Sequence, residues 1–141
     1  MPINRQFIGY TLPPFTVTVE AERLRQFASA IGAPPGSDSS GAPPTYLKVI
    51  EGEGNSSRNL LTLLGVDLKR VLHAEQEFEY HAPYRAGDQL AVERTVSNIY
   101  ERKAGQLEFI VVDTVIRHTS GQLVGRTQQV ILVRNPAPVA A

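Results

Sequence analysis

The 141-residue sequence contains no cysteine. Neither a disulfide framework nor a thiolate metal site is therefore available, and the composition suits a reducing compartment. The sequence also lacks any stretch of about 18 continuous apolar residues, the length that a membrane span needs, and it does not open with a basic region followed by an apolar run. These absences predict a cytoplasmic protein that does not enter a membrane.

An excess of charge of one sign is missing as well. Fourteen lysine and arginine residues balance fourteen aspartate and glutamate residues, and neither sign forms a long block. Proteins that bind nucleic acids or anionic lipids concentrate basic side chains on one surface. The sequence therefore predicts neither of these partners. Its length suits one domain with a core large enough to be stable without cross-links.

The first half of the sequence carries helical patterns after a short strand at residues 15–17. Residues 18–32 place apolar side chains on one helical face, with Thr18 as the expected N-cap and Gly32 as the closing residue. Residues 33–44 hold four prolines, three serines and two glycines, which favour a loop. A second helical region begins at Thr45, is interrupted at residues 52–55 and resumes at residues 56–64. Leucines over a wide arc predict that this last piece is a central, buried helix.

The second half changes to the period of strands. Alternation after Gly65 predicts strands at residues 72–80, 90–100, 107–116 and 123–133. The first of them should bury its even positions, and the third, which is apolar on both faces, suits the centre of a sheet or a subunit contact. Turn residues at 84–88 predict a hairpin between the first two strands. We expect one domain over residues 1–134 and a mobile Pro/Ala-rich tail over residues 135–141.

Helices followed by a meander of antiparallel strands predict an α+β domain in which the sheet wraps around one central helix. An open sheet of this size leaves an unpaired edge, and such edges are usually covered or paired. Dimerisation is the simplest way to cover it.

Several segments resemble one known family. Residues 71–81, Val-Leu-His-Ala-Glu-Gln-Glu-Phe-Glu-Tyr-His, are followed by Pro83 and the run Arg-Ala-Gly-Asp at residues 85–88. Together with residues 27–32, 42–46 and 63–68, they resemble the N-terminal MaoC-like, or FAS1-like, dehydratase family over most of the chain. The resemblance implies a hot-dog fold, an acyl-CoA or acyl-carrier-protein ligand, and reversible hydration of a trans-2-enoyl thioester to the (R)-3-hydroxyacyl form. It implies no cofactor and no metal.

The chain departs from this family where the chemistry needs an acid and a base. Catalytically complete relatives carry an Asp/His pair in a Gly-Asp-x-Asn-Pro-x-x-His type of run directly after the first amphipathic helix. Here Ala33 follows Gly32 in place of the aspartate, and no histidine occurs between Gly32 and His73. The resemblance is therefore to the acyl-binding half of a heterodimer, whose MaoC-like partner contributes the Asp and the His. A homodimer stays open as the alternative.

The candidate catalytic residues that remain are His73 and Asp38. His73 lies in the strand motif, where a half-exposed histidine beside glutamates is the simpler interpretation. Asp38 lies in a serine- and glycine-rich segment that favours a turn. The expected substrate-binding residues are Thr45 and Tyr46, where a backbone N–H at the start of the second helical region would hold the thioester oxygen. Arg85 is the third, because its guanidinium suits a phosphate, although an exposed arginine in a turn is the simpler interpretation.

Two other functions stay open. Hot-dog thioesterases place a carboxylate on the central helix, and Glu51 or Glu53 would supply it, although both fall at the 52–55 interruption, where exposure is expected. The chain would alternatively be a non-catalytic acyl-binding module. Tyr46 and the leucines of residues 60–64 would line an acyl tunnel or form plain core, and the sequence does not separate these two roles.

Overall fold

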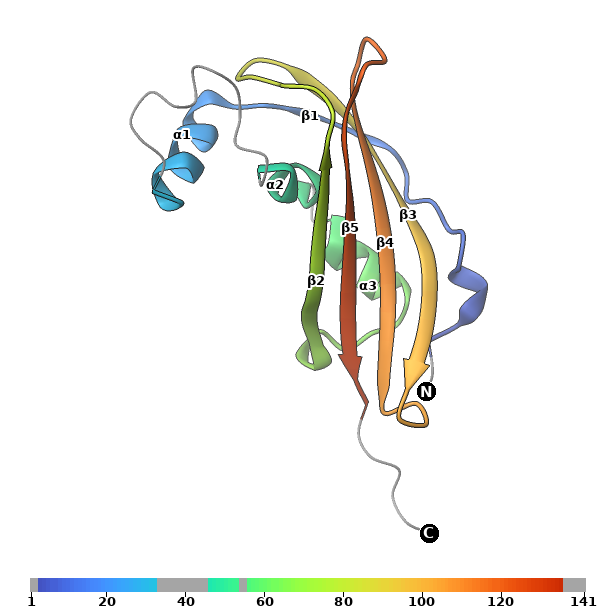
Figure 1. The fold of residues 1–141 in the computed structure, drawn as a ribbon. Coiled ribbons are helices and arrows are strands. Elements are labelled where there is room, and N and C mark those ends of the chain that lie inside the picture. The colour runs from blue at the N-terminus through green and yellow to red at the C-terminus, as the bar shows by residue number, and fades with distance from the viewer. Residues whose placement is uncertain (1–2, 33–45, 54–55, 136–141) are drawn as a thin grey trace.

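Five antiparallel strands form one curled sheet in the order β1-β3-β4-β5-β2. The computed structural model describes residues 3–32, 46–53 and 56–135, and leaves the side chain of His73 undescribed. The long strands stand side by side in Figure 1, and the first and last described residues, Ile3 and Asn135, lie at the same end of the sheet. The strands are β1 (Phe15–Thr18), β2 (Val71–Tyr80), β3 (Gln89–Arg102), β4 (Leu107–His118) and β5 (Leu123–Arg134).

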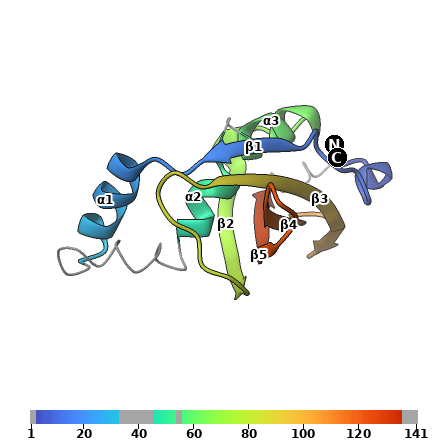
Figure 2. The same ribbon diagram turned by 90° about the horizontal axis from the view of Figure 1, so that it is seen from above.

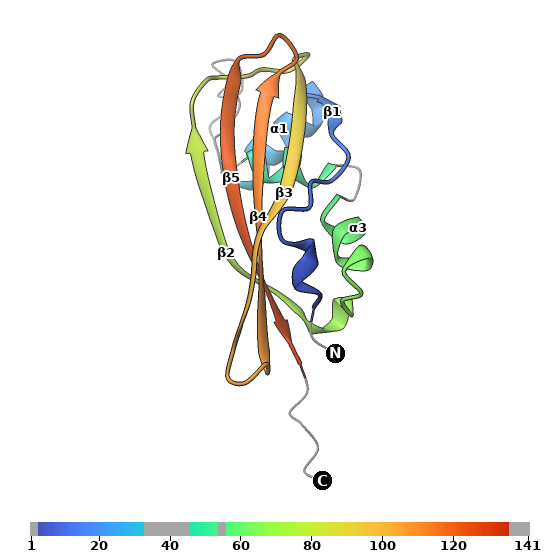
Figure 3. The ribbon, with the colours of Figure 1, turned by 90° about the vertical axis from the view of Figure 1, so that its right-hand side faces the viewer.

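The helices gather on one face of this sheet. Figure 3 shows α1, α2 and α3 on the same side, and Figure 2 shows from above that α1 lies beyond the end of β1. The opposite face carries no helix within the described residues. The helices are α1 (Ala21–Ala30), α2 (Leu47–Glu51) and α3 (Ser56–Leu63), with short 3-10 turns at η1 (Arg5–Phe7) and η5 (Leu68–Arg70). The arrangement confirms the predicted α+β class.

The strand predictions hold within three residues at every end. Strand β4 was expected at the centre of the sheet, and it lies between β3 and β5 with both neighbours hydrogen-bonded along its length. Its inward residues are fully buried and several of its outward residues are also apolar. A strand with two neighbours and apolar side chains on both faces matches the physical basis of the prediction.

The predicted hairpin between β2 and β3 is wrong. Strand β2 pairs with β5, and β4 and β5 separate it from β3. The connecting segment crosses the end of the sheet instead of turning back. The backbone N–H groups of His81 and Ala82 both donate to the carbonyl of Val124, and that of Gly87 donates to the carbonyl of Val19. Turn residues alone signal a change of direction, but they do not choose the strand that comes next in space.

The expected buried face of β2 is also not formed. Leu72 and Tyr80 are 49% and 40% exposed. A bulge between His73 and Glu75 adds one residue to the strand, so Leu72 lies opposite Leu132 while Phe78 lies opposite Thr127. One extra residue exchanges the two faces of a strand. Positions that the alternation assigned to one face therefore lie on opposite faces of an edge strand.

The first helix begins later than its pattern suggested. Thr18 is the last residue of β1 rather than an N-cap, and Glu20 precedes α1 without capping it through its side chain. The polar side chains at 18, 20 and 22 suit an exposed strand end as well as a helix start. Gly32 has a φ of 76° just after α1, which is the left-handed closure that was predicted.

The central position against the sheet belongs to α2 rather than to residues 56–64. Helix α2 packs on β3 and β5, and Leu47 and Ile50 are fully buried there. Helix α3 is amphipathic: Leu60 and Leu61 are buried, whereas Leu63 is 48% exposed. The prediction of a helix buried on most sides is therefore wrong for α3, because a wide arc of leucines does not require that every leucine is covered.

Two apolar clusters fill the space between the helices and the sheet. The α2 cluster surrounds the central helix, and the α3 cluster lies beneath α3 at the other end of the strands. The α2 cluster contains Val17, Val19, Leu24, Tyr46, Leu47, Ile50, Tyr84, Leu90, Val92, Ile116 and Val124. The α3 cluster contains Ile3, Leu12, Leu60, Leu61, Leu64, Val96, Ile99, Ile110, Val112, Ile131 and Val133.

The two ends of the described chain meet at Glu108. This buried carboxylate accepts hydrogen bonds from the backbone N–H of Ile3 and from the side chains of Arg5 and Asn135. Residues 136–141, which hold most of the predicted tail, lie outside the described residues. None of the described helices has the length and apolarity that crossing a membrane requires.

Candidate functional site

A cluster of three aromatic side chains, Phe27, Tyr46 and Tyr84, lies at the start of α2. Tyr46 directly precedes this helix and is 2% exposed. Its ring centroid lies 5.1 Å from that of Phe27 on α1 and 6.4 Å from that of Tyr84, on which it stacks at 15°. Burial raises the pKa of Tyr46 above the ordinary tyrosine value, against a smaller opposing effect of Arg23. The ring predicted to contact substrate is thus held in the core by two other aromatic side chains.

Tyr84 is the least expected member of this group. It is 1% exposed, and its hydroxyl has no hydrogen-bond partner within the described structure. Burial, followed by the neighbouring Tyr80 and Tyr46 side chains, raises the pKa of Tyr84 well above the ordinary value. A buried hydroxyl without a partner costs about 1–3 kcal/mol. Such a hydroxyl lowers the stability of the folded chain unless it forms a hydrogen bond with a ligand.

Sequence reasoning missed Tyr84. It follows Pro83 and precedes Arg85 in a segment whose composition indicates a turn, and both of these neighbours are exposed. Backbone hydrogen bonds to Val19 and Val124 hold the segment over the end of the sheet, and in this position the Tyr84 side chain points into the core. No periodic pattern of apolar residues in this segment predicts that Tyr84 is buried.

A belt of buried polar side chains crosses the sheet beneath the end of α2. Glu51, expected to be exposed, is 0% exposed, so that expectation is wrong. It occupies the third inward position of α2, after Leu47 and Ile50 at helical spacing. Its Oε2 accepts a hydrogen bond from the Thr127 hydroxyl, and Lys48 Nζ lies 3.4 Å from Oε1 without hydrogen-bond geometry. We call the buried residues Glu51, Arg94, Thr114, Thr127 and Gln129 the polar belt.

Arg94 is the centre of the polar belt. The side chain is 1% exposed, and its Nε donates to Thr114 Oγ1 at 3.0 Å and its Nη2 to Gln129 Oε1 at 2.7 Å. Its Nη1 donates to Ser56 Oγ and Ser57 Oγ at 2.9 and 2.8 Å, and to the carbonyl of Glu51 at 3.3 Å. Burial lowers the pKa of Arg94, and the Glu51 carboxylate opposes this. One guanidinium therefore ties the end of α2 and the start of α3 to three strands.

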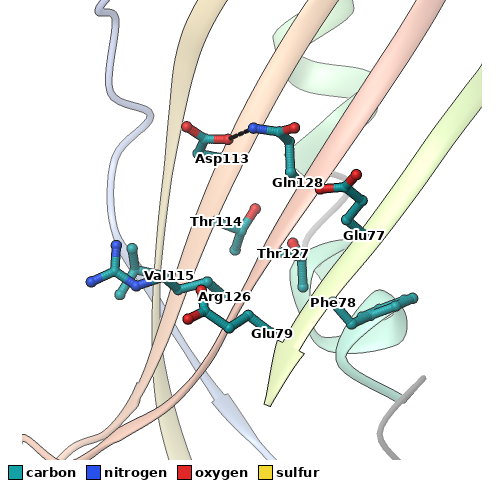
Figure 4. Close-up of a pocket in the computed structure, with 9 residues that line it drawn as sticks. All are labelled: Glu77, Phe78, Glu79, Asp113, Thr114, Val115, Arg126, Thr127 and Gln128. Carbon is teal, nitrogen blue, oxygen red and sulfur yellow. Dashed lines mark hydrogen bonds between the residues drawn. The ribbon is translucent and has the colours of Figure 1, made fainter. Parts of the chain in front are cut away.

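Two hollows adjoin the polar belt. A groove of 630 Å³ runs beside β1 and the starts of α1 and α3, and the ion pair of Arg23 with Glu53 forms part of its polar wall. A cavity of 290 Å³ lies over β2, β5 and β4 (Figure 4). In it, Gln128 donates to Asp113 at 2.9 Å on the face of the sheet that carries no described helix. Of the predicted site residues that the structure describes, Glu53 lines the groove and Glu51 lines neither hollow, whereas Thr114 and Thr127 of the polar belt line the cavity.

The sequence and the fold now place the chain among known proteins. Residues 6–127 match the family model described as FAS1-like, dehydratase domain region. The chain belongs to this dehydratase family. It is 36% identical over 154 residues to a UPF0336 protein of Parafrankia sp. (strain EAN1pec), covering 98% of this chain and 99% of that one.

Solved structures agree with the family assignment. The C-terminally truncated HadBC (3R-hydroxyacyl-ACP dehydratase) complex from Mycobacterium tuberculosis superposes with a TM-score of 0.71 at 22% identity, covering 89% of this chain and 96% of that one. The ChsH1-ChsH2 complex from Mycobacterium tuberculosis gives a TM-score of 0.67 at 18% identity, covering 92% and 87%. At these identities the likeness shows the fold alone. It is the hot-dog fold of MaoC-like dehydratases, which confirms the predicted fold and the resemblance.

Against the pattern of the dehydratase family, the histidines of this chain are placed unfavourably for acid–base work. His81 Nε2 lies 3.0 Å from a carboxylate oxygen of Glu79 on an exposed stretch of chain. His118 Nε2 lies 3.1 Å from the carbonyl of Pro83. The backbone of His73 pairs with Ile131 in β2. Neither described histidine side chain forms a pair with an aspartate.

The other predicted site residues are only partly located. Asp38 and Thr45 lie outside the described residues. Arg85 is exposed in the segment between β2 and β3, where its backbone N–H donates to Asp88 Oδ2 at 2.8 Å. A role in binding a phosphate stays a prediction. Among residues 3–32, 46–53 and 56–135, no three metal-ligating side chains gather into a possible metal site.

Proposed function

We propose that the chain is the acyl-thioester-binding subunit of an (R)-specific enoyl-thioester hydratase, or 3-hydroxyacyl-thioester dehydratase, whose partner chain supplies the Asp/His pair. The observation that carries the proposal is the state of the histidines. The sequence contains three histidines, and none of them lies directly after α1, where the family motif has its histidine. His81 contacts Glu79, and His118 contacts the backbone carbonyl of Pro83. These placements support a base and an acid that come from another chain.

The reaction divides the work between the two chains. As the oxygen of water bonds to C3 of the enoyl group, a base removes its proton, and C2 receives a proton from an acid while charge accumulates on the thioester oxygen. The partner performs the two proton transfers. This chain binds and orients the thioester near Thr45 and Tyr46. The Tyr84 hydroxyl, which has no hydrogen-bond partner among the described residues, is available there to donate to an oxygen of the substrate. No cofactor or metal enters this scheme.

Edge strand β2 offers a place for the partner. Among the described strands its only neighbour is β5, and it exposes the large side chains of Leu72 and Tyr80. Unpaired edges with apolar side chains are sites where strands of another chain add. The structures named HadBC and ChsH1-ChsH2 are both complexes, which supports a heterodimer over a homodimer. A role in fatty acid metabolism in the cytoplasm would fit such a pair.

The test is hydration of crotonyl-CoA, followed by loss of its conjugated enoyl-thioester absorbance. The chain is assayed alone and after co-expression with the MaoC-like chain from the same organism that carries the complete Asp and His motif. We expect no turnover from the chain alone and turnover from the pair. The matched control is a partner in which the motif histidine is replaced by alanine, which should lower the rate by about 10²–10⁴.

Three outcomes would count against the proposal. Rapid hydration by the chain alone would indicate that His73 or Asp38 is catalytic and that no partner is needed. Release of free thiol from acyl-CoA, lost in Glu53→Gln, would indicate a thioesterase. Glu51 is a poorer nucleophile or base for that reaction, because its carboxylate is bonded to Thr127 and lines neither hollow described above. Acyl-CoA binding that no partner converts into turnover would indicate a non-catalytic acyl-binding module.

A further inference from the structure

Three glutamates alternate along the outward face of β2, on the side of the sheet that carries no described helix. Glu75, Glu77 and Glu79 are all exposed, and Glu77 lies opposite Gln128 of β5 on that face (Figure 4). Among the described side chains, the three carboxylates have one ion-pair partner, His81, which lies beside Glu79. We call Glu75, Glu77 and Glu79 the acidic row. Most of its negative charge is not compensated within the described part of the chain.

The acidic row lies on an open edge of the sheet. Among the described strands, β2 pairs only with β5, and the backbone N–H of His81 donates to the carbonyl of Val124 beside it. Because hydrogen bonds alternate along an antiparallel pair, the backbone groups of Phe78 and Tyr80 point to the other side of β2. The exposed side chains of Leu72 and Tyr80 flank the row. Such an edge favours the addition of a strand from another chain.

A second copy of this chain would meet the acidic row with its own. In an antiparallel pair, side chains that lie directly opposite each other share one face of the sheet. Two copies related by a two-fold axis, with their helices on the same side, therefore place outward side chains against outward side chains. A register centred on Glu77 sets Glu77 against itself and Glu75 against Glu79. Every register centred between residues 75 and 79 sets at least one glutamate against another, and like charges in this position destabilise the pair.

We propose that the acidic row selects the partner of this chain, a different chain whose edge strand carries lysine or arginine opposite the glutamates and an apolar side chain at each end of the row. The inference rests on the proposed function, which requires a second chain. A basic strand replaces repulsion along this edge by attraction and covers Leu72 and Tyr80 with apolar contacts. Three opposite-charge pairs across two strands strengthen association about 3- to 150-fold. A second copy of this chain loses affinity instead.

The first test needs no other protein. The triple variant Glu75→Lys, Glu77→Lys, Glu79→Lys is mixed with wild type, so that a basic strand of known sequence is offered to the acidic row. The wild type is labelled with ¹⁵N, and native mass spectrometry counts the mixed dimer and the two like dimers. At low concentrations of ammonium acetate we expect at least ten mixed dimers for each like dimer. High concentrations should lower this ratio, because salt screens exposed charges.

Random proportions of the three dimers at low salt, or no dimer in the mixture, would overturn the inference. A second variant, Glu75→Gln, Glu77→Gln, Glu79→Gln, removes the charge without reversing it. Its own dimer should form at a protein concentration at least threefold lower than the wild-type dimer needs. This variant decides if the lysine variant does not fold, and a neutral variant that associates no better than wild type would also count against the acidic row.

The second test uses the MaoC-like partner of the hydration assay. In calorimetry at low salt, the triple lysine variant should bind this partner at least tenfold more weakly than wild type. The matched control is Glu93→Lys, on the same face of the sheet but within β3, which has neighbours on both sides. It should bind as wild type does. Equal binding of wild type and triple variant, in pairs that hydrate crotonyl-CoA, would overturn the inference and leave the proposed function standing. A partner that does not bind the wild type would overturn the proposed function itself.

Discussion

Replacing Thr127 by valine should destabilise the domain out of proportion to the size of the change. Valine keeps the shape of threonine and removes one hydroxyl, which is the only described hydrogen-bond partner of the Glu51 carboxylate. Both residues are at most 3% exposed, so water does not replace the lost bond. A hydrogen bond to a charged group contributes about 1.5–3 kcal/mol.

The magnitude is measured by urea unfolding and by calorimetric Tm. We expect the free energy of unfolding of Thr127→Val to fall by about 1.5–3 kcal/mol and its Tm to fall by about 4–10 °C. The matched control is Thr95→Val, since the Thr95 hydroxyl is bonded to that of Thr11 at an exposed position, 3.2 Å away. The control should change stability by less than about 0.5 kcal/mol. Equal effects of the two substitutions would refute the idea that the belt is held by buried hydrogen bonds.

Other substitutions test the packing of α2 and the unpartnered hydroxyl. A Cβ on Gly125 would lie 2.7 Å from the Glu79 carbonyl oxygen and 3.0 Å from Leu47 Cδ1, so Gly125→Ala should lower the free energy of unfolding by about 1–3 kcal/mol. At Gly52 the nearest described atom would be 3.5 Å away, so Gly52→Ala should be neutral or stabilising. Tyr84→Phe should keep or raise stability at neutral pH but weaken hexanoyl-CoA binding in calorimetry; unchanged binding would remove Tyr84 from the site. Because the pKa of folded Tyr84 is raised above the unfolded value of 10.0, the wild type should lose stability as the pH rises above that value, and more steeply than Tyr84→Phe when unfolding is followed by circular dichroism.

The candidate site shows where sequence reasoning reaches its limit. The absence of an Asp/His motif after α1 is a property of residue order, so it needs no coordinates. The environment of Glu51 is different, because two of its hydrogen-bond partners, Arg94 and Thr127, are 43 and 76 positions away along the chain. A glycine-rich interruption next to Glu51 suggested exposure, and the fold instead closes two strands and a helix over the carboxylate. Nothing in the local composition carries that information.

By itself, the sequence determined the α+β class, the positions of the long strands and the missing catalytic motif. These depend on the alternation of neighbouring side chains and on which residue types are present, and both are local. Only the tertiary structure decided that β2 pairs with β5, that Tyr84 is buried with no hydrogen-bond partner for its hydroxyl among the described residues, and that a polar belt lies between the two apolar clusters. Those features arise from hydrogen bonds and packing between residues far apart in the chain. Such contacts form only when the whole domain folds, so local sequence patterns do not predict them.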